Sequence, residues 1–213
     1  MVKAVIWDFG GVLTTSPFEA FNVYEAERGL PKDLIRTINA TNGDTNAWAQ
    51  FESNAVTLDE FDGLFAAEAK ERGYNVPGKD IIALLSGDLR PKMVEALRRI
   101  SERLITGCIT NNVKAGEGAG MARSADKVAA NDAVMDMFQV VIQSSKVGLR
   151  KPDPKIYQMA LKALDIAPED AVYIDDLGIN LKPARAMGMQ TIKVVNADVA
   201  LAELEDAVGF ALQ

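Results

Sequence analysis

The sequence contains no histidine and a single cysteine, Cys108. Without histidine, neither a Ser-His-Asp nor a Cys-His nucleophile pair can form, and a histidine-based zinc site is excluded. Acid–base chemistry must therefore depend on carboxylates, lysine or water. A single cysteine excludes an intrachain disulfide, which fits a reducing compartment. Cys108 lies inside an apolar run, so we expect a core residue and not a catalytic thiol.

The sequence also has no long apolar run and no excess of positive charge. No run approaches the roughly 18 apolar residues of a membrane span, and Asp8 interrupts an N-terminal stretch that is too short for a signal peptide. The formal net charge of −7 argues against a nucleic acid or a membrane surface as a partner. We therefore expect a cytoplasmic protein, either a monomer or a homodimer. A small anionic substrate stays compatible with this charge, because a metal ion or a few lysines can reverse its sign locally.

What the sequence does contain is an alternation of short apolar runs and helical patterns. This alternation predicts an α/β fold with a doubly wound parallel sheet, and 213 residues suffice for one such core with a small accessory domain. The strands are expected at 4–8, 104–110, 138–143, 171–176 and 190–195. The helices between them are expected at 91–103, 154–165 and 181–188.

Residues 16–89 break this alternation, because their apolar positions recur with a helical period and no convincing strand appears. Thr57 and Glu60 make a plausible capping box before the longest helical segment. We therefore expect an all-helical cap domain at 16–89, inserted into an α/β core made of 1–15 and 90–213. Whether aromatic residues of this insert, such as Phe18, Phe21, Trp48 and Phe51, form its core or a pocket stays open. A glycine-rich stretch (Gly116, Gly118 and Gly120) follows the second strand and is a candidate gating loop.

Polar side chains follow four of the predicted strands at the point where each strand ends. These side chains are Asp8, then Thr110 and Asn111, then Lys146, Arg150 and Lys151, and finally Asp175 and Asp176. Ligands bind at the carboxyl ends of the strands in open α/β sheets, so we expect these groups in one crevice. Three carboxylates there would repel one another. Mg²⁺ prefers oxygen ligands and would relieve the repulsion, and a lysine could hold a phosphate oxygen.

Four motifs in this order carry a resemblance to a known family. They are DFGGVLT, ITNN, VGLRKPDPKIY and YIDDLGINLKPARAMGM. Together they resemble the motifs of the haloacid dehalogenase superfamily, whose members are mostly phosphotransferases and phosphatases. The segments NAWAQFESNAVTLDEF and LRPKMVEALRRI are more closely similar to the branch that includes the N-terminal phosphatase domain of soluble epoxide hydrolases.

This resemblance implies Mg²⁺-dependent hydrolysis of a small phosphate monoester. Asp8 would attack phosphorus and form an aspartyl-phosphate, and Lys151 would neutralise charge on the nucleophile and the phosphate. Thr110 and the Asn111 amide would bind the phosphoryl group. The helical insert would close over the substrate and exclude water.

The resemblance also implies a set of metal ligands. Mg²⁺ would bind Asp8, the backbone carbonyl of Gly10 and Asp176. Asp175 would contact these ligands without binding the metal, or would bind it through a water molecule. At position 10, most phosphatases of the superfamily have an aspartate that protonates the leaving alcohol and later activates water. Glycine keeps the carbonyl but cannot transfer a proton, and such transfer is typically worth about 10²–10⁴-fold in rate. We therefore expect a slow phosphatase that prefers good leaving groups, although some relatives also have glycine there.

Two alternatives remain open from the sequence. In a 2-haloacid dehalogenase, Asp8 would attack carbon without a metal ion and without an acid at position 10. Such enzymes usually lack the paired acids Asp175 and Asp176, which favours phosphate chemistry. The other alternative is a non-catalytic member of the family that binds a phosphorylated ligand or a partner protein.

Overall fold

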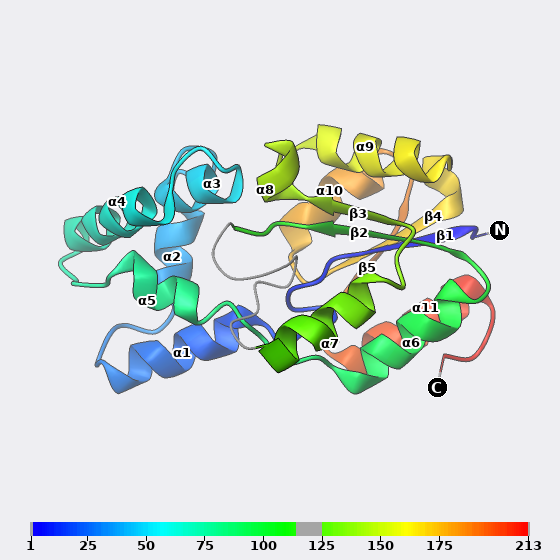
Figure 1. Ribbon diagram of the computed structural model, residues 1–213, viewed down its shortest axis with the longest axis horizontal. Coiled ribbons are helices and arrows are strands. Elements are labelled where there is room, and N and C mark those ends of the chain that lie inside the picture. Colours follow the sequence, from blue (N-terminus) through cyan, green and yellow to red (C-terminus); the bar gives the residue numbers. More distant parts are fainter. Residues whose placement is uncertain (1, 114–124, 213) are drawn as a thin grey trace.

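The computed structural model describes residues 2–113 and 125–212 (Figure 1). Its centre is a five-stranded sheet with the order β3-β2-β1-β4-β5, in which all neighbouring strands are parallel. The strands are β1 (Ala4–Trp7), β2 (Ile105–Thr110), β3 (Val140–Gln143), β4 (Ala171–Asp175) and β5 (Gln190–Lys193). The doubly wound α/β class is confirmed, and each predicted strand agrees with the observed one to within two residues. The order reverses between β1 and β4, which is where such sheets bind ligands.

Helices cover both faces of this sheet (Figure 1). One face carries α6 (Pro91–Ser101), α7 (Ala125–Met135) and α11 (Ala197–Val208), and the other carries α8 (Ser144–Val147), α9 (Pro154–Leu164) and α10 (Gly178–Ala186). Successive residues of β1 point to opposite faces, so Val5 and Trp7 join the cluster under α6 and α11, while Ile6 joins the cluster under α9 and α10. Burial on both faces explains why the central strands β1 and β4 are almost entirely apolar, whereas the edge strand β5 has exposed polar residues at both ends.

The helices differ from the expectation in a few places. Helix α10 starts at Gly178, three residues before the expected helix, and ends at Ala186. Helices α8 and α11 and the short 3₁₀ helix Pro168–Asp170 were not predicted from the sequence. Helix α11 has a clear local cause, because the side chain of Asn196 caps it by accepting hydrogen bonds from the amides of Asp198 and Val199.

Residues 16–89, all of which the structure describes, form five helices and no strand beyond a single bridge between Thr14 and Leu89. The helices are α1 (Pro17–Glu27), α2 (Leu34–Ala40), α3 (Ala47–Glu52), α4 (Leu58–Glu71) and α5 (Gly78–Ala83). They pack around an apolar cluster of their own, in which the rings of Phe51 and Phe61 stack with centroids 4.6 Å apart. The expected capping box of Thr57 and Glu60 is present at the start of α4.

This helical insert faces the carboxyl ends of the strands (Figure 1). The connections that follow β1 and β4 therefore open towards it. Within the described residues, no helix combines the length and the apolarity needed to cross a bilayer. The glycines at positions 116, 118 and 120 lie outside the described residues, so the gating hypothesis stays a prediction.

Candidate active site

Asp8 follows β1 at the centre of the sheet and is 7% exposed. Its backbone amide donates to the carbonyl of Ile174 on β4 (2.9 Å), which continues the pairing of the two strands by one residue. Its carboxylate oxygen Oδ1 accepts a hydrogen bond from the amide of Phe9 (2.7 Å) and lies 2.8 Å from the Nζ atom of Lys151. The sheet therefore fixes the backbone of Asp8, and the turn after it fixes the carboxylate.

Lys151 is 1% exposed and lies between two carboxylates. Its Nζ atom is 2.8 Å from Asp8 Oδ1 and also 2.8 Å from Asp175 Oδ2. Burial alone would lower the pKa of this ammonium, but the charges of Asp175 and Asp8 raise it above its ordinary value. Lys151 is therefore a fixed positive charge.

Asp175 is fully buried at the end of β4. Besides Lys151, its oxygens accept hydrogen bonds from the hydroxyl of Tyr173 (2.6 Å), the amide of Leu177 (2.8 Å) and the side chain of Asn180 (3.1 Å). The carboxylate thus has protein donors on both oxygens, and it fixes the position of the Lys151 ammonium.

Among the described residues, the carboxylates of Asp8, Asp175 and Asp176 form a cluster whose nearest oxygens all lie within 4.8 Å of one another. Burial raises the pKa of the Asp8 carboxyl, Lys151 opposes this shift, and the other two acids add to it. Burial and the charge of Asp175 also raise the pKa of Asp176, to about 7. One lysine therefore does not compensate three acids. A divalent cation with oxygen ligands fits this deficit of positive charge, because it stabilises the ionised carboxylates.

The two glycines after Asp8 have different surroundings. A β-carbon at Gly11, whose φ is +77°, would lie 2.2 Å from Oδ2 of Asp176, so only glycine lets the backbone approach this carboxylate. At Gly10, no described atom beyond its two chain neighbours lies within 4 Å of the position that a β-carbon would take. The fold thus has room for a side chain at position 10 and none at position 11. The sequence analysis missed Gly11, although the glycine doublet was visible.

Thr110 and Asn111 end β2 beside this cluster and line the same cavity. The Asn111 side chain holds the backbone of Lys151 at both polar groups. Its Oδ1 accepts from the Lys151 amide (2.8 Å) and its Nδ2 donates to the Lys151 carbonyl (3.0 Å). By contrast, Lys146 is exposed on α8 and lies apart from these groups. Cys108 is buried in the core, as expected, and burial raises the pKa of its thiol.

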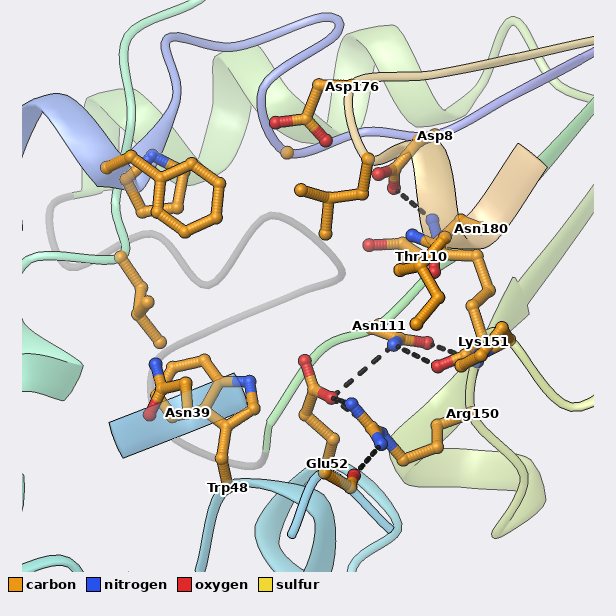
Figure 2. Close-up of a pocket in the computed structure, with 18 of the residues that line it drawn as sticks. Asp8, Asn39, Trp48, Glu52, Thr110, Asn111, Arg150, Lys151, Asp176 and Asn180 are labelled. Atoms are coloured by element: carbon orange, nitrogen blue, oxygen red, sulfur yellow. Dashed lines mark hydrogen bonds and ion pairs between the residues drawn. The ribbon is translucent and has the colours of Figure 1, made fainter. Parts of the chain in front are cut away.

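A cavity of about 490 Å³ lies between the insert and the carboxyl ends of the strands (Figure 2). The core contributes polar residues at one end, including Asp8, Thr110, Lys151 and Asp176, and Gly10 lies beside them. The insert contributes the apolar side chains of Pro17, Phe18, Phe21, Trp48 and Leu85, together with the polar residues Arg36, Asn39, Asp44 and Glu52. Phe18 and Trp48 are thus pocket residues, and Phe21 both lines the cavity and is buried in the insert's own core. Phe51 lies in that core and does not line the cavity.

A haloacid dehalogenase-like hydrolase family model matches residues 2–188. Among curated proteins, the chain is 34% identical over 219 residues to acyl-CoA dehydrogenase family member 10 of Mus musculus (99% of this chain, 19% of that protein). It is 29% identical to bifunctional epoxide hydrolase 2 of the same species (98% and 39%). The chain thus spans less than half the length of these two relatives. It is also 26% identical to the sesquiterpene phosphatase astK of Aspergillus oryzae, with 97% of both chains covered.

Solved structures share the fold. A HAD-family enzyme of Bacteroides thetaiotaomicron, in complex with magnesium and inorganic phosphate, matches with a TM-score of 0.58 at 20% identity, covering 91% of this chain and 94% of that one. L-2-haloacid dehalogenase of Xanthobacter autotrophicus, with chloropropionic acid covalently bound, matches with a TM-score of 0.62 at 17% identity (99% and 85%). At these identities the matches establish the fold and leave the chemistry to the residues of the site.

Proposed function

Since the chain belongs to the haloacid dehalogenase-like hydrolase family, we propose that it is a Mg²⁺-dependent phosphatase acting on a small phosphate monoester through an aspartyl-phosphate on Asp8. The observation that carries this proposal is the buried Lys151 ammonium, 2.8 Å from both Asp8 and Asp175 beside a third acid. A dianionic phosphate needs compensating positive charge, and this end of the cavity has a lysine and a set of oxygen ligands that suits a cation. The phosphatase named among the relatives supports the same chemistry.

In the first step, a carboxylate oxygen of Asp8 attacks phosphorus. A bond forms between that oxygen and phosphorus, and the bond from phosphorus to the ester oxygen breaks, so that the alcohol leaves with the electron pair and takes a proton. In the second step, a water oxygen attacks phosphorus, the bond to Asp8 breaks, and hydrogen phosphate is released with the Asp8 carboxylate regenerated. The proton that this water gives to solvent replaces the one that the alcohol took from solvent in the first step. Lys151 offsets negative charge on Asp8 and on the phosphoryl oxygens in both steps.

Mg²⁺ would be held by the carboxylates of Asp8 and Asp176 and by the carbonyl of Gly10. When bound there, it supplies positive charge next to the phosphoryl oxygens. Asp175 would not bind the metal ion directly, because its oxygens already accept hydrogen bonds from Lys151 and three further donors. Thr110 and the backbone amide of Asn111 would bind the phosphoryl group beside Lys151, since the Asn111 side chain already contacts the Lys151 backbone and Glu52.

Gly10 leaves the departing alcohol without a proton donor on the neighbouring residue. The open space around position 10 admits water, which is a weak acid. We therefore propose that the rate depends strongly on the leaving group, with aryl and acyl phosphates hydrolysed faster than alkyl phosphates.

The substrate class follows from the cavity wall. Residues 16–89 would act as the cap over a core of 1–15 and 90–213, closing above the phosphate and excluding water. Its aromatic residues Phe18, Phe21 and Trp48 line the cavity opposite the acids. A phosphate ester with an apolar organic group matches both ends of this cavity, and the sesquiterpene phosphatase among the relatives supports this choice. The net charge of −7 remains the argument against nucleic acid and membrane partners, and a cytoplasmic location and a monomeric or homodimeric state stay predictions.

The test is hydrolysis of p-nitrophenyl phosphate with and without Mg²⁺ by the wild type, Asp8→Asn and, as a matched control, Asp59→Asn on the exposed surface of α4. We expect Mg²⁺-dependent release of p-nitrophenol by the wild type and the control, and none by Asp8→Asn. Halide release from 2-chloropropionate, with no phosphatase activity, would indicate the dehalogenase alternative. Tight Mg²⁺-dependent binding of a phosphorylated ligand without turnover would indicate the binding-only alternative.

A further inference from the structure

An ion pair inside the cavity joins the helical insert to the core. Arg150, in the connection between α8 and α9, donates from Nε to Oε2 of Glu52 at the end of α3 (2.8 Å), and a second guanidinium nitrogen lies 2.7 Å from the same oxygen. The Nη1 atom of Arg150 donates to the carbonyl of Gly43, which precedes α3 (2.8 Å). The guanidinium thus binds the insert at two points. The Glu52 side chain is 9% exposed and that of Arg150 23%, in contrast to surface pairs such as Lys79 with Asp59 (52% and 87%).

The same carboxylate oxygen also reaches the candidate phosphoryl site. Asn111 Nδ2 lies 3.4 Å from Glu52 Oε2, and the Asn111 amide group holds the amide and carbonyl of Lys151. Lys151 in turn contacts Asp8. Figure 2 shows Glu52 in contact with both Arg150 and Asn111, and Asn111 in contact with Lys151. Glu52 of the insert is therefore connected to Asp8 through Asn111 and Lys151, with a contact at each step.

The placement of Glu52 makes this connection dependent on the position of the insert. Glu52 belongs to α3, so its contacts with Arg150 and Asn111 exist only while the insert rests against the core. A largely buried arginine that loses its carboxylate is left without compensation, and the Asn111 amide loses its contact on that side. Since displacements of about 1 Å at a reacting group can cost about 10²-fold in rate, a small shift of Asn111 or Lys151 is enough to affect catalysis.

We propose that Glu52 is a positioning residue of the phosphoryl site: it holds Arg150 and the Asn111 side chain, and so sets the backbone of Lys151 when the insert is closed. The catalytic part of this inference rests on the proposed phosphatase function. It assigns to the insert a second task besides covering the substrate, because the closed insert completes the geometry of groups that belong to the core.

The first test is a double-mutant cycle with Glu52→Ala, Asn111→Ala and the double variant, assayed with p-nitrophenyl phosphate and with an alkyl phosphate. We expect Glu52→Ala to lower kcat about ten- to hundredfold by the same factor for both substrates, since the phosphoryl group is common to them. In the Asn111→Ala background, the further loss should be small, because the residue through which Glu52 acts is already absent. Glu52→Gln, which keeps an acceptor for Arg150, should restore part of the activity. Asp59→Ala is the matched control in the insert and should leave kcat unchanged.

Two results of the cycle would overturn the inference. Equal losses from Glu52→Ala with and without the Asn111 side chain would show that Glu52 does not act through Asn111. A loss confined to the alkyl phosphate would make Glu52 a proton donor to the leaving group and not a positioning residue.

The second test needs no turnover. Hydrogen exchange at the Lys151 amide, which donates to Asn111 Oδ1 (2.8 Å), is compared in the substrate-free wild type, Glu52→Gln and Glu52→Ala. We expect faster exchange in Glu52→Ala, an intermediate rate in Glu52→Gln, and unchanged exchange in the strands. An unchanged rate at Lys151 would refute the positioning role. A wild type that lacks phosphatase activity would refute the proposed function instead, while this measurement would still decide the role of Glu52.

Discussion

The backbone of Gly11 packs against the carboxylate of Asp176, so closely that a β-carbon at position 11 would lie 2.2 Å from Oδ2. The turn after β1 and the turn after β4 thus meet with no room for a side chain between them. The position of one candidate metal ligand, Asp176, is therefore set by the absence of a side chain at a residue far away in the sequence.

Gly11→Ala should displace Asp176 and strain a backbone with φ of +77°. We expect the affinity for Mg²⁺ to fall about 10–100-fold, as happens when neighbours of metal ligands are altered, together with a lower free energy of unfolding. Calorimetric titration with Mg²⁺ and thermal unfolding measure both effects. The control is Gly63→Ala in α4, where no described atom lies within 4 Å of the added carbon. That variant should bind Mg²⁺ normally and gain about 0.5–1 kcal/mol in stability. Normal Mg²⁺ binding by Gly11→Ala would contradict the assignment of Asp176.

Gly10→Asp should supply the missing proton donor, since the fold has room for a side chain there. We expect kcat for alkyl phosphates to rise, up to about 10²–10⁴-fold, and kcat for p-nitrophenyl phosphate to rise much less because p-nitrophenolate leaves without a proton. A series of leaving groups measures this as a steep dependence on leaving-group pKa in the wild type and a flat one in the variant. Gly10→Asn, which has the same shape but no proton to give, should show no gain. An equal gain in both variants would rule out the proton-transfer explanation.

Lys151→Met should abolish activity and destabilise the fold. Removal of the lysine leaves the buried carboxylates of Asp8 and Asp175 unpaired, and such losses typically cost about 3–5 kcal/mol. Urea unfolding with and without Mg²⁺ measures the change. Added Mg²⁺ should stabilise Lys151→Met more than the wild type, because a bound dication replaces the lost positive charge. A variant as stable as the wild type without Mg²⁺ would show that the acids do not depend on Lys151.

Trp48→Ala should lower kcat/KM for substrates with an apolar organic group. The indole lines the cavity opposite the acids, and the loss of a large apolar contact costs about 1.5–3 kcal/mol, or roughly 10–100-fold in kcat/KM. The comparison is between a long-chain alkyl phosphate and methyl phosphate, which reaches only the polar end. Phe51→Leu, in the same helix but 2% exposed and outside the cavity lining, should lower stability without this selectivity. Equal losses for both substrates in Trp48→Ala would argue against an apolar subsite.

The sequence predicted those features that a short segment determines by itself. The central strands β1 and β4 are buried apolar runs, so their positions were visible. The capping box of Thr57 and Glu60 could be read from two residues. The cluster of Asp8, Lys151, Asp175 and Asp176 could be predicted because the carboxyl ends of parallel strands converge.

Features that depend on contacts between distant segments were not visible. Glu52 and Arg150 are separated by 98 positions, and nothing local to either marks them as a pair. Gly11 looked like an ordinary turn residue, because its constraint comes from Asp176 in the turn after β4. The residues of the cavity wall could be predicted only in part. A helical period identifies the apolar face of α3, but it does not show whether Trp48 or Phe51 faces the core.

The strand order has a consequence for how the site comes into being as the chain is synthesised. β1 is made first among the strands. The segments that pair with it, in β2 and β4, begin only at Ile105 and Ala171. The helices of the insert pack mostly against one another and can fold before β2 and β4 are available to pair with β1, since local contacts form faster than distant ones. Asp8 therefore leaves the ribosome long before Lys151, Asp175 and Asp176 do. A partly synthesised chain would have the helical insert without the cluster of acids and lysine.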